Sequence, residues 1–364
     1  MGFNRYYAIV GLIAASVFSC VTAAQVVGET QRIATQPSGE VRDATGNTAL
    51  RVTVWYPAKS DSIVEPVVIG PPQDPLFVVG SVSFNAPIMT SSDSSGRRPV
   101  ILLSHGFGGT ARMMGWFATA MAKEGFIVIS VDHPGNNGGD EMTIEGGILW
   151  WERAVDLRLA FERIQRDEVL GPHIDPERVG VAGFSAGGFT ALLLGGAQVD
   201  RAHFAEFCQK NPGDGVCRPQ VEFSITEPDM QNVVQDPRVA DYFAQSQNDY
   251  SIPSAKAVFV MAPALVQATS PKSLKAISIP VSIIAGEADA VAPAETNALV
   301  AAKLVPESDI TMLPDAGHYV FLSVCTPNGK KLVPVCAQTG EQSYAHSMAI
   351  SQARKLFTKR LAKP

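Results

Sequence analysis

Beyond its first 24 residues, the sequence lacks any apolar run of the ~20 residues that a membrane-spanning helix needs. It also lacks internal repeats, low-complexity segments and an excess of basic residues: 29 Lys and Arg stand against 35 Asp and Glu, for a formal net charge of −6. An acidic chain of this kind is not expected to bind nucleic acid or an anionic membrane surface. The composition does not exclude small neutral or hydrophobic ligands, and it predicts no oligomeric state.

Cysteine is scarce, with five in 364 residues. Four of them, Cys208, Cys217, Cys325 and Cys336, follow the first 24 residues and could pair in three ways. Their short spacings favour Cys208 with Cys217 and Cys325 with Cys336, and free buried thiols are the alternative. Neither pair has the Cys-x-x-Cys spacing of a structural zinc site, so we predict no metal.

Residues 1–24 have the pattern of a secretory signal peptide. Arg5 supplies a positive start, residues 8–18 form an uncharged apolar run, and residues 22–24 are small, as a cleavage site requires. Lipid attachment at Cys20 is an alternative, disfavoured by the bulky Phe18. The sequence therefore predicts a secreted or periplasmic protein, in a compartment where disulfides form.

The remaining residues, 25–364, are predicted to form a single domain. Residues 25–98 are expected to be a β-rich lead-in that packs on the main sheet, with a strand at 51–57. Residues 197–256 show little strand pattern and interrupt the regular order of elements. We interpret them as a candidate cap over the substrate pocket.

The rest of the chain alternates short apolar strands with amphipathic helices, which predicts an α/β fold with a mostly parallel, doubly wound sheet. One expected helix has an apolar stripe that starts at Trp150, while Trp151 is expected to cover a helix face. A closing helix is expected at 344–361. The expected core strands are 100–104, 126–131, 179–184, 257–261, 280–285 and 310–313.

The strand at 179–184 ends in Gly183-Phe184-Ser185-Ala186-Gly187, a Gly-x-Ser-x-Gly pattern followed by a helix. A strand that turns at once into a helix crowds the backbone, so the flanking residues must be small. Such a turn presents the serine hydroxyl above the sheet edge, as in a nucleophile elbow. The pattern predicts Ser185 as a nucleophile.

A serine nucleophile needs a histidine base and a carboxylate that orients it. Asp289 follows the strand at 280–285, and His318 follows the last strand, in the chain order Ser, Asp, His. The competing acids are Glu287, Asp132 and Asp315. Of the other histidines, His105 and His133 end earlier strands and are expected to brace loops.

An acyl-transfer site also needs two backbone amides to hold an oxyanion. Ala186, at the start of the helix after Ser185, is predicted to supply one. The glycine-rich loop His105-Gly106-Phe107-Gly108-Gly109 is predicted to supply the other from Phe107, whose ring would line the pocket. A plain tight turn is the alternative reading of this loop.

Five motifs together resemble the α/β-hydrolase superfamily: residues 104–109, 131–135 and 183–188, the Asp289 turn and Ala-Gly-His at 316–318. Within it, they are similar to the branch of secreted dienelactone-hydrolase-like and platelet-activating-factor acetylhydrolase-like esterases. Dienelactone hydrolases proper use a cysteine nucleophile, whereas this chain has Ser185. The resemblance implies an ester hydrolase without cofactor or metal.

The sequence thus predicts an exported serine esterase that acts on small-molecule esters. Oxidised or short-chain phospholipids, polyesters, and the amide bonds of an amidase or peptidase are alternatives, because the leaving group is not encoded in the triad. A non-catalytic binding protein is a more remote alternative. Loss of a triad residue would be its usual sign, and none is lost.

Overall fold

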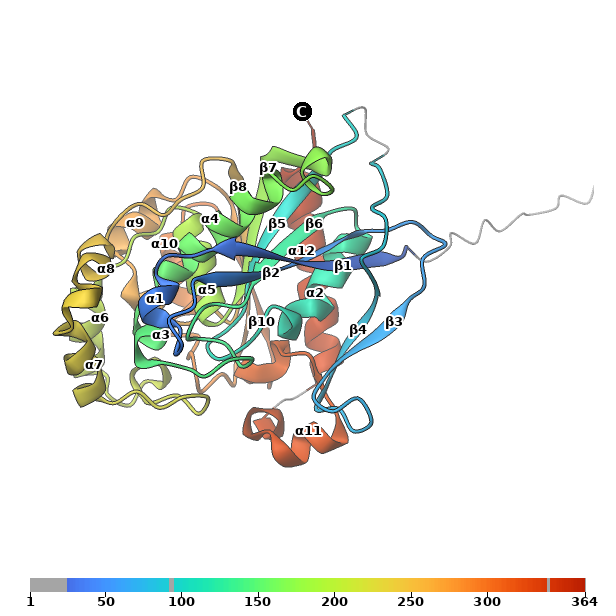
Figure 1. Ribbon diagram of the computed structural model, residues 1–364. Helices are drawn as coiled ribbons and strands as arrows, with labels where there is room; N and C mark the ends of the chain where they lie inside the picture. The colour runs from blue at the N-terminus through green and yellow to red at the C-terminus, as the bar shows by residue number, and fades with distance from the viewer. Residues whose placement is uncertain (1–24, 92–94, 339–340, 364) are drawn as a thin grey trace, which may run out of the picture.

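The computed structural model describes residues 25–91, 95–338 and 341–363 (Figure 1). The predicted signal peptide, including Cys20, lies outside the described residues.

Strands of the described chain form an 11-stranded sheet in the order β10-β9-β8-β7-β5-β6-β2-β1-β4-β11, with β3 paired to β4. The strands from β10 to β6 are parallel to their neighbours. The strands are β1 Val27–Thr35, β2 Ala49–Pro57, β3 Glu65–Ile69, β4 Phe77–Phe84, β5 Arg98–Ser104, β6 Ile127–Val131, β7 Ile174–Phe184, β8 Ala255–Met261, β9 Val281–Gly286, β10 Ser308–Leu313 and β11 Val324–Cys325.

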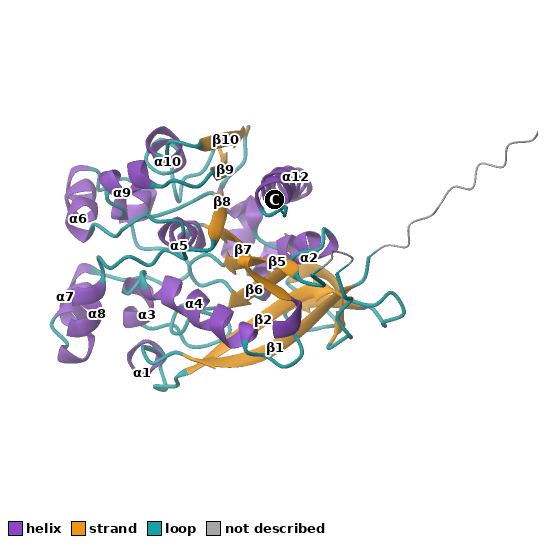
Figure 2. Ribbon diagram, turned by 90° about the horizontal axis from the view of Figure 1, so that it is seen from above, coloured by secondary structure: helices purple, strands orange, loops and turns teal. Residues whose placement is uncertain are grey.

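The helices cover both faces of the sheet (Figure 2). Contacts with the strands place α2 and α12 on one face and α4, α5 and α10 on the other. The α-helices are α1 Gly39–Arg42, α2 Gly115–Lys123, α3 Ile144–Ile148, α4 Glu152–Gln165, α5 Ala186–Leu194, α6 Arg201–Lys210, α7 Glu227–Val234, α8 Ala240–Gln245, α9 Pro271–Ala276, α10 Ala298–Leu304, α11 Pro327–Leu332 and α12 Gln342–Arg360. Short 3₁₀ helices lie at Arg112–Met114, Gly171–His173, Gly215–Cys217, Pro237–Val239, Val266–Ala268, His318–Phe321 and Pro334–Gln338.

The buried stretches of the central strands are mostly apolar because helices cover them on both sides. Every residue of β6 and β9 is buried. Phe189 and Leu157 fill the layer on the α4 and α5 side, and Phe117 and Phe357 fill the opposite layer. Full burial of each such side chain stabilises the fold by about 1.5–3 kcal/mol. The predicted mostly parallel sheet with flanking helices is confirmed.

The lead-in joins the same sheet. β2 runs antiparallel to β6, and β1 runs antiparallel to β2, so antiparallel strand pairs extend the parallel core. The indole of Trp55 in β2 donates a hydrogen bond to Glu29 in β1 at 2.8 Å, which satisfies both buried groups. The strands of residues 25–91 therefore lengthen the sheet.

The segment after α5, which interrupts the alternation of strands and helices, contains helices and no strand of the main sheet before β8. α6, α7 and α8 lie at one side of the molecule (Figures 1 and 2), where α7 contacts α3 and α6 contacts the 3₁₀ helix Val266–Ala268. The expected boundary at residue 256 overruns the segment, because β8 already begins at Ala255. The β8 residues pair with β7 and so belong to the main sheet.

The two tryptophans before α4 differ from expectation. α4 begins at Glu152, so Trp150 lies outside the helix, where its half-buried ring packs edge-on against Phe189 and Phe204. Trp151 is fully buried and contacts Phe243. Trp150 thus packs on the core that the stripe faces although it precedes the helix, whereas Trp151, expected to cover a helix face, is buried.

The four cysteines of the described chain form two disulfides. Cys208 pairs with Cys217 and Cys325 with Cys336, with Cα atoms 5.4 Å and 5.8 Å apart. Both are the local pairings that the spacings favoured. Disulfides are typical of proteins that fold in an oxidising compartment. Among the described residues, no helix is both long and apolar enough to cross a bilayer.

Candidate active site

Ser185 lies at the sharp turn between β7 and α5, with φ 56° and ψ −122°. A positive φ is rare for a residue other than glycine and marks a strained turn. The turn closes only because its neighbours have no side chain: a Cβ on Gly183 would lie 2.0 Å from the carbonyl oxygen of Gly187. The Ser185 amide donates to the carbonyl of Met261 at 3.0 Å, which anchors the turn to β8.

His318 connects Ser185 to Asp289. Its Nε2 lies 2.8 Å from Ser185 Oγ, and its Nδ1 lies 2.7 Å from Asp289 Oδ2. With the ring neutral, Nδ1–H donates to the carboxylate and Nε2 accepts from the serine hydroxyl. Ser185, His318 and Asp289 are 7%, 3% and 5% exposed. The three residues form a shielded hydrogen-bonded array at the carboxyl edge of the sheet.

The second oxygen of Asp289 is also held. Its Oδ1 accepts the amides of Val291 at 3.0 Å and Ala292 at 2.8 Å, in the turn that follows β9. These bonds leave Oδ2 directed at His318. Such fixation of the carboxylate is what an orienting residue requires.

The competing acids lie elsewhere. Glu287 and Asp315 are exposed, and Asp315 occupies a tight turn with φ 56°. Asp132 binds Arg51 and accepts the amide of Ala111. Asp289 is the acid that the structure brings to His318.

The loop at residues 105–111 packs directly against Ser185. A Cβ on Gly106 would lie 3.2 Å from Ser185 Cβ, so a side chain at this position would crowd the serine. Phe107 follows it and is half-buried. Ala186 is the first residue of α5, where amides have no partner within the helix and favour negative charge. Phe107 and Ala186 therefore both lie beside Ser185.

A second Ser-His-Asp array lies behind this loop. Ser104 Oγ is 2.9 Å from His133 Nε2, and His133 Nδ1 is 2.7 Å from Asp156 Oδ2. All three side chains are fully buried, so no substrate can reach this serine. His133 also donates its backbone amide to His105 Nε2 at 3.3 Å. As expected, both histidines brace loops.

Two buried arginines complete the array. Arg42 makes a bidentate ion pair with Asp156, at 2.8 and 2.9 Å. Arg153 donates to the backbone carbonyl of His105 and to Asn136. The array thus ties α1 and α4 to the first residues of the 105–111 loop. Sequence reasoning missed Asp156 and Arg153, although two charged residues on the apolar face of a predicted helix were an available signal.

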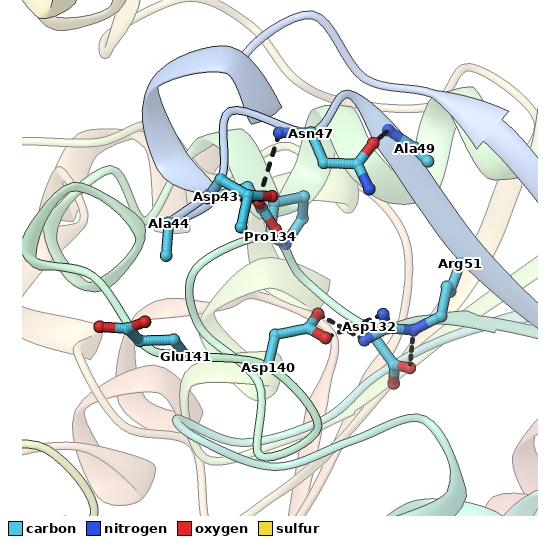
Figure 3. Close-up of a pocket in the computed structure, with 10 residues that line it drawn as sticks. Asp43, Ala44, Asn47, Ala49, Arg51, Asp132, Pro134, Asp140 and Glu141 are labelled. Carbon is cyan, nitrogen blue, oxygen red and sulfur yellow. Dashed lines mark hydrogen bonds and ion pairs between the residues drawn. The ribbon is translucent and has the colours of Figure 1, made fainter.

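A cavity of about 200 Å³ lies between the start of β2 and the loop after β6 (Figure 3). Its lining includes Asp43, Asp132, Asp140 and Glu141, and it contains none of the three residues of the Ser185 array. Arg51 pairs with Asp132 and Asp140, which neutralises part of the acidic charge. Within the described chain, no group of His, Cys, Asp and Glu is arranged to hold a metal ion.

Buried histidines outside the Ser185 array have altered protonation. Burial lowers the pKa of His133 to about 3 and that of His346 to about 4, and it also lowers the pKa of His105. His346 stacks on Trp116, with ring centroids 3.7 Å apart. These histidines are therefore neutral in the folded protein near pH 7.

This burial predicts acid-sensitive stability. In the unfolded chain each histidine regains an ordinary pKa of about 6.5, so protons bind the unfolded state more strongly. The free energy of unfolding is expected to be constant above about pH 7 and to fall as the pH drops from about 6.5 towards 4. Urea unfolding at pH 7.5 and 5.0 measures this. A smaller fall is expected for His346→Phe, and equal stability of the wild type at both pH values would contradict the prediction.

None of the curated proteins matches this chain in sequence. The fold is similar to that of a ferulic acid esterase from Streptomyces cinnamoneus, with a TM-score of 0.60, 17% sequence identity and 95% of each chain covered. The model of the alpha/beta hydrolase family matches residues 100–326, which is more than half of the chain and includes Ser185, Asp289 and His318. The chain therefore belongs to the alpha/beta hydrolase family.

Proposed function

We propose that this protein is an exported serine hydrolase that cleaves carboxylic esters through Ser185, His318 and Asp289. The observation that carries the proposal is the position of His318, which bridges Ser185 Oγ and Asp289 Oδ2 within a shielded site. An imidazole held between a hydroxyl and a carboxylate is arranged to remove the proton of the hydroxyl as it attacks.

The proposed reaction has two halves. Ser185 Oγ attacks the ester carbonyl carbon while His318 Nε2 takes the hydroxyl proton, and the carbonyl oxygen becomes an oxyanion. The amides of Phe107 and Ala186 hold that oxyanion. The carbon–oxygen bond to the alcohol then breaks, and His318 returns the proton to the leaving alcohol. A water molecule, deprotonated by His318, releases the acyl group as a carboxylic acid and restores Ser185.

The site favours small monomeric esters. Ser185 is only 7% exposed, whereas a polyester chain would need an open groove along the nucleophile. The ferulic acid esterase of the same fold acts, by its name, on an ester of a small aromatic acid, which supports ester chemistry here. The motifs at 104–109, 131–135 and 183–188 support the secreted dienelactone-hydrolase-like branch, and residues 197–254, before β8, would serve as the cap.

The direct test uses a fluorophosphonate probe and two matched substrates. The probe is expected to label Ser185 and to increase the mass of the protein by that of one bound probe. The ester p-nitrophenyl butyrate is expected to be cleaved far faster than the p-nitroanilide of butyrate. Faster cleavage of the anilide would establish an amidase instead. Failure of both labelling and hydrolysis would favour the binding protein.

A further inference from the structure

One segment crosses the site from its acid loop to its 105–111 loop. It comprises residues 211–226, between α6 and α7, and is called the strap below. Near its start, Asp214 accepts a hydrogen bond from Thr296 at 2.7 Å, and a Cβ on Gly215 would lie 2.2 Å from the carbonyl oxygen of Ala290. The Cys208–Cys217 disulfide ties this end to α6. The strap therefore begins packed against the turn that holds Asp289.

The other end of the strap lies over the 105–111 loop. A Cβ on Gly147 would lie 2.4 Å from Ile225 and 3.6 Å from the ring of Phe107, so these three residues meet. A Cβ on Gly108 would lie 3.1 Å from Glu222 Cβ. Glu222 therefore packs against Gly108, the residue that follows Phe107, the proposed oxyanion donor.

Glu222 also contacts the histidine side of the site. Tyr319, which follows His318 and is buried, donates its hydroxyl to Glu222 Oε1 at 3.0 Å. Burial and the Glu222 carboxylate raise the pKa of Tyr319, so its hydroxyl stays protonated and remains a donor. The carboxylate is therefore held between the loop of the proposed oxyanion hole and the loop of the proposed base.

The second oxygen of Glu222 has no donor. Oε2 is shielded from solvent, and among the described residues no group donates a hydrogen bond to it. Within the same residues, no Lys, Arg or His forms an ion pair with Glu222. A shielded carboxylate oxygen without a donor is costly and rare in native proteins. A group that enters with the substrate can supply the missing donor.

We propose that Glu222 is a specificity residue whose Oε2 accepts a hydrogen bond from a hydroxyl or protonated amine of the ester. This inference rests on the proposed esterase function and names its substrate class: small esters that carry a hydrogen-bond donor near the scissile bond. A hydrogen bond to a charged acceptor discriminates by about 1.5–3 kcal/mol, which corresponds to roughly 10- to 150-fold in kcat/KM.

Matched pairs of esters test the donor. On the alcohol side, 2-hydroxyethyl butyrate is compared with 2-methoxyethyl butyrate; on the acyl side, methyl 3-hydroxybutyrate is compared with methyl 3-methoxybutyrate. In at least one pair, the wild type is expected to prefer the hydroxyl ester at least 10-fold in kcat/KM. Dimethylaminoethyl butyrate, whose ammonium has an N–H, is compared with the choline ester, which has charge but no donor. Preference for the dimethylaminoethyl ester alone would identify the donor as an amine.

The variant Glu222→Leu removes the acceptor at similar length and is expected to reduce the preference, measured as the ratio of kcat/KM on the two esters of a pair, to less than 3-fold. Glu222→Gln keeps an acceptor for Tyr319 but loses the charge. Glu222→Gln is expected to lose any preference for the ammonium ester. It replaces Glu222→Leu in the test if that variant does not fold. Glu227→Gln, at an exposed position at the start of α7, is the matched control and should keep the wild-type preference.

Equal cleavage within every pair by the wild type would overturn the role of Glu222, as would an unchanged preference in Glu222→Leu. The outcome is separable from that of the proposed function. If the fluorophosphonate labels Ser185 and all the esters are cleaved without discrimination, the esterase stands and only the donor subsite fails. Absence of both labelling and cleavage would reject the esterase itself.

Discussion

Replacing Ser185 with alanine is expected to lower kcat on p-nitrophenyl butyrate by about 10⁴- to 10⁶-fold. His318 Nε2 would lose the hydroxyl that it contacts at 2.8 Å, and no acyl-enzyme could form. The proposed oxyanion donors, the amides of Phe107 and Ala186, are unchanged in this variant, so some residual rate above the uncatalysed reaction is expected. Steady-state kinetics and loss of fluorophosphonate labelling measure the effect.

The fold should survive this change. Alanine is smaller than serine, and the substitution removes the hydrogen bond between the Ser185 side chain and His318. The turn itself is held by backbone hydrogen bonds to Met261 and Ala264, which the substitution does not change. Unchanged far-UV circular dichroism and a Tm within a few degrees of the wild type serve as the control. Ser224→Ala, at an exposed serine of the strap, should leave kcat unchanged. A Ser185→Ala protein with more than a tenth of the wild-type activity would refute the nucleophile assignment.

Replacing Asp156 with asparagine is expected to destabilise the protein by about 3–5 kcal/mol. The substitution keeps the shape of the side chain but leaves the fully buried Arg42 without its counter-charge, and it weakens the bond that orients His133. Loss of this size is a large fraction of the 5–15 kcal/mol that is typical of a folded domain. The midpoint of urea unfolding at pH 7.5 measures it.

A double variant separates the charge from the packing. Arg42→Met with Asp156→Leu removes both charges, so it is expected to cost less than Asp156→Asn alone, because Arg42 is no longer left as a buried charge without its ion-pair partner. The control is Glu206→Gln, which breaks a fully exposed ion pair with Lys210 and should not change the midpoint. A Asp156→Asn protein as stable as the wild type would show that the buried array contributes nothing to stability.

The sequence alone was sufficient where the determinants are local. The elbow at Ser185 was predictable because a strand, a crowded turn and a helix are all encoded within the 21 residues from Ile174 to Leu194, and the turn needs glycine at 183 and 187. The order of strands then placed Asp289 and His318 at the same sheet edge. Parallel strands end at one edge whatever the details of packing.

Features made by long-range contacts could not be predicted in this way. Arg42 and Asp156 are separated by 114 positions, and their pairing depends on how α1 meets α4. No periodicity in the sequence reports such a contact.

What the sequence by itself determined is the alpha/beta hydrolase order of strands and helices and the identity of Ser185, Asp289 and His318 as candidates. What only the tertiary structure decided is what surrounds them. The strap has no periodic pattern, and Glu222 looks in the sequence like any surface acid. Its position between Gly108 and Tyr319 arises from packing between segments about 100 residues apart, which is set by the whole fold and not by neighbouring residues.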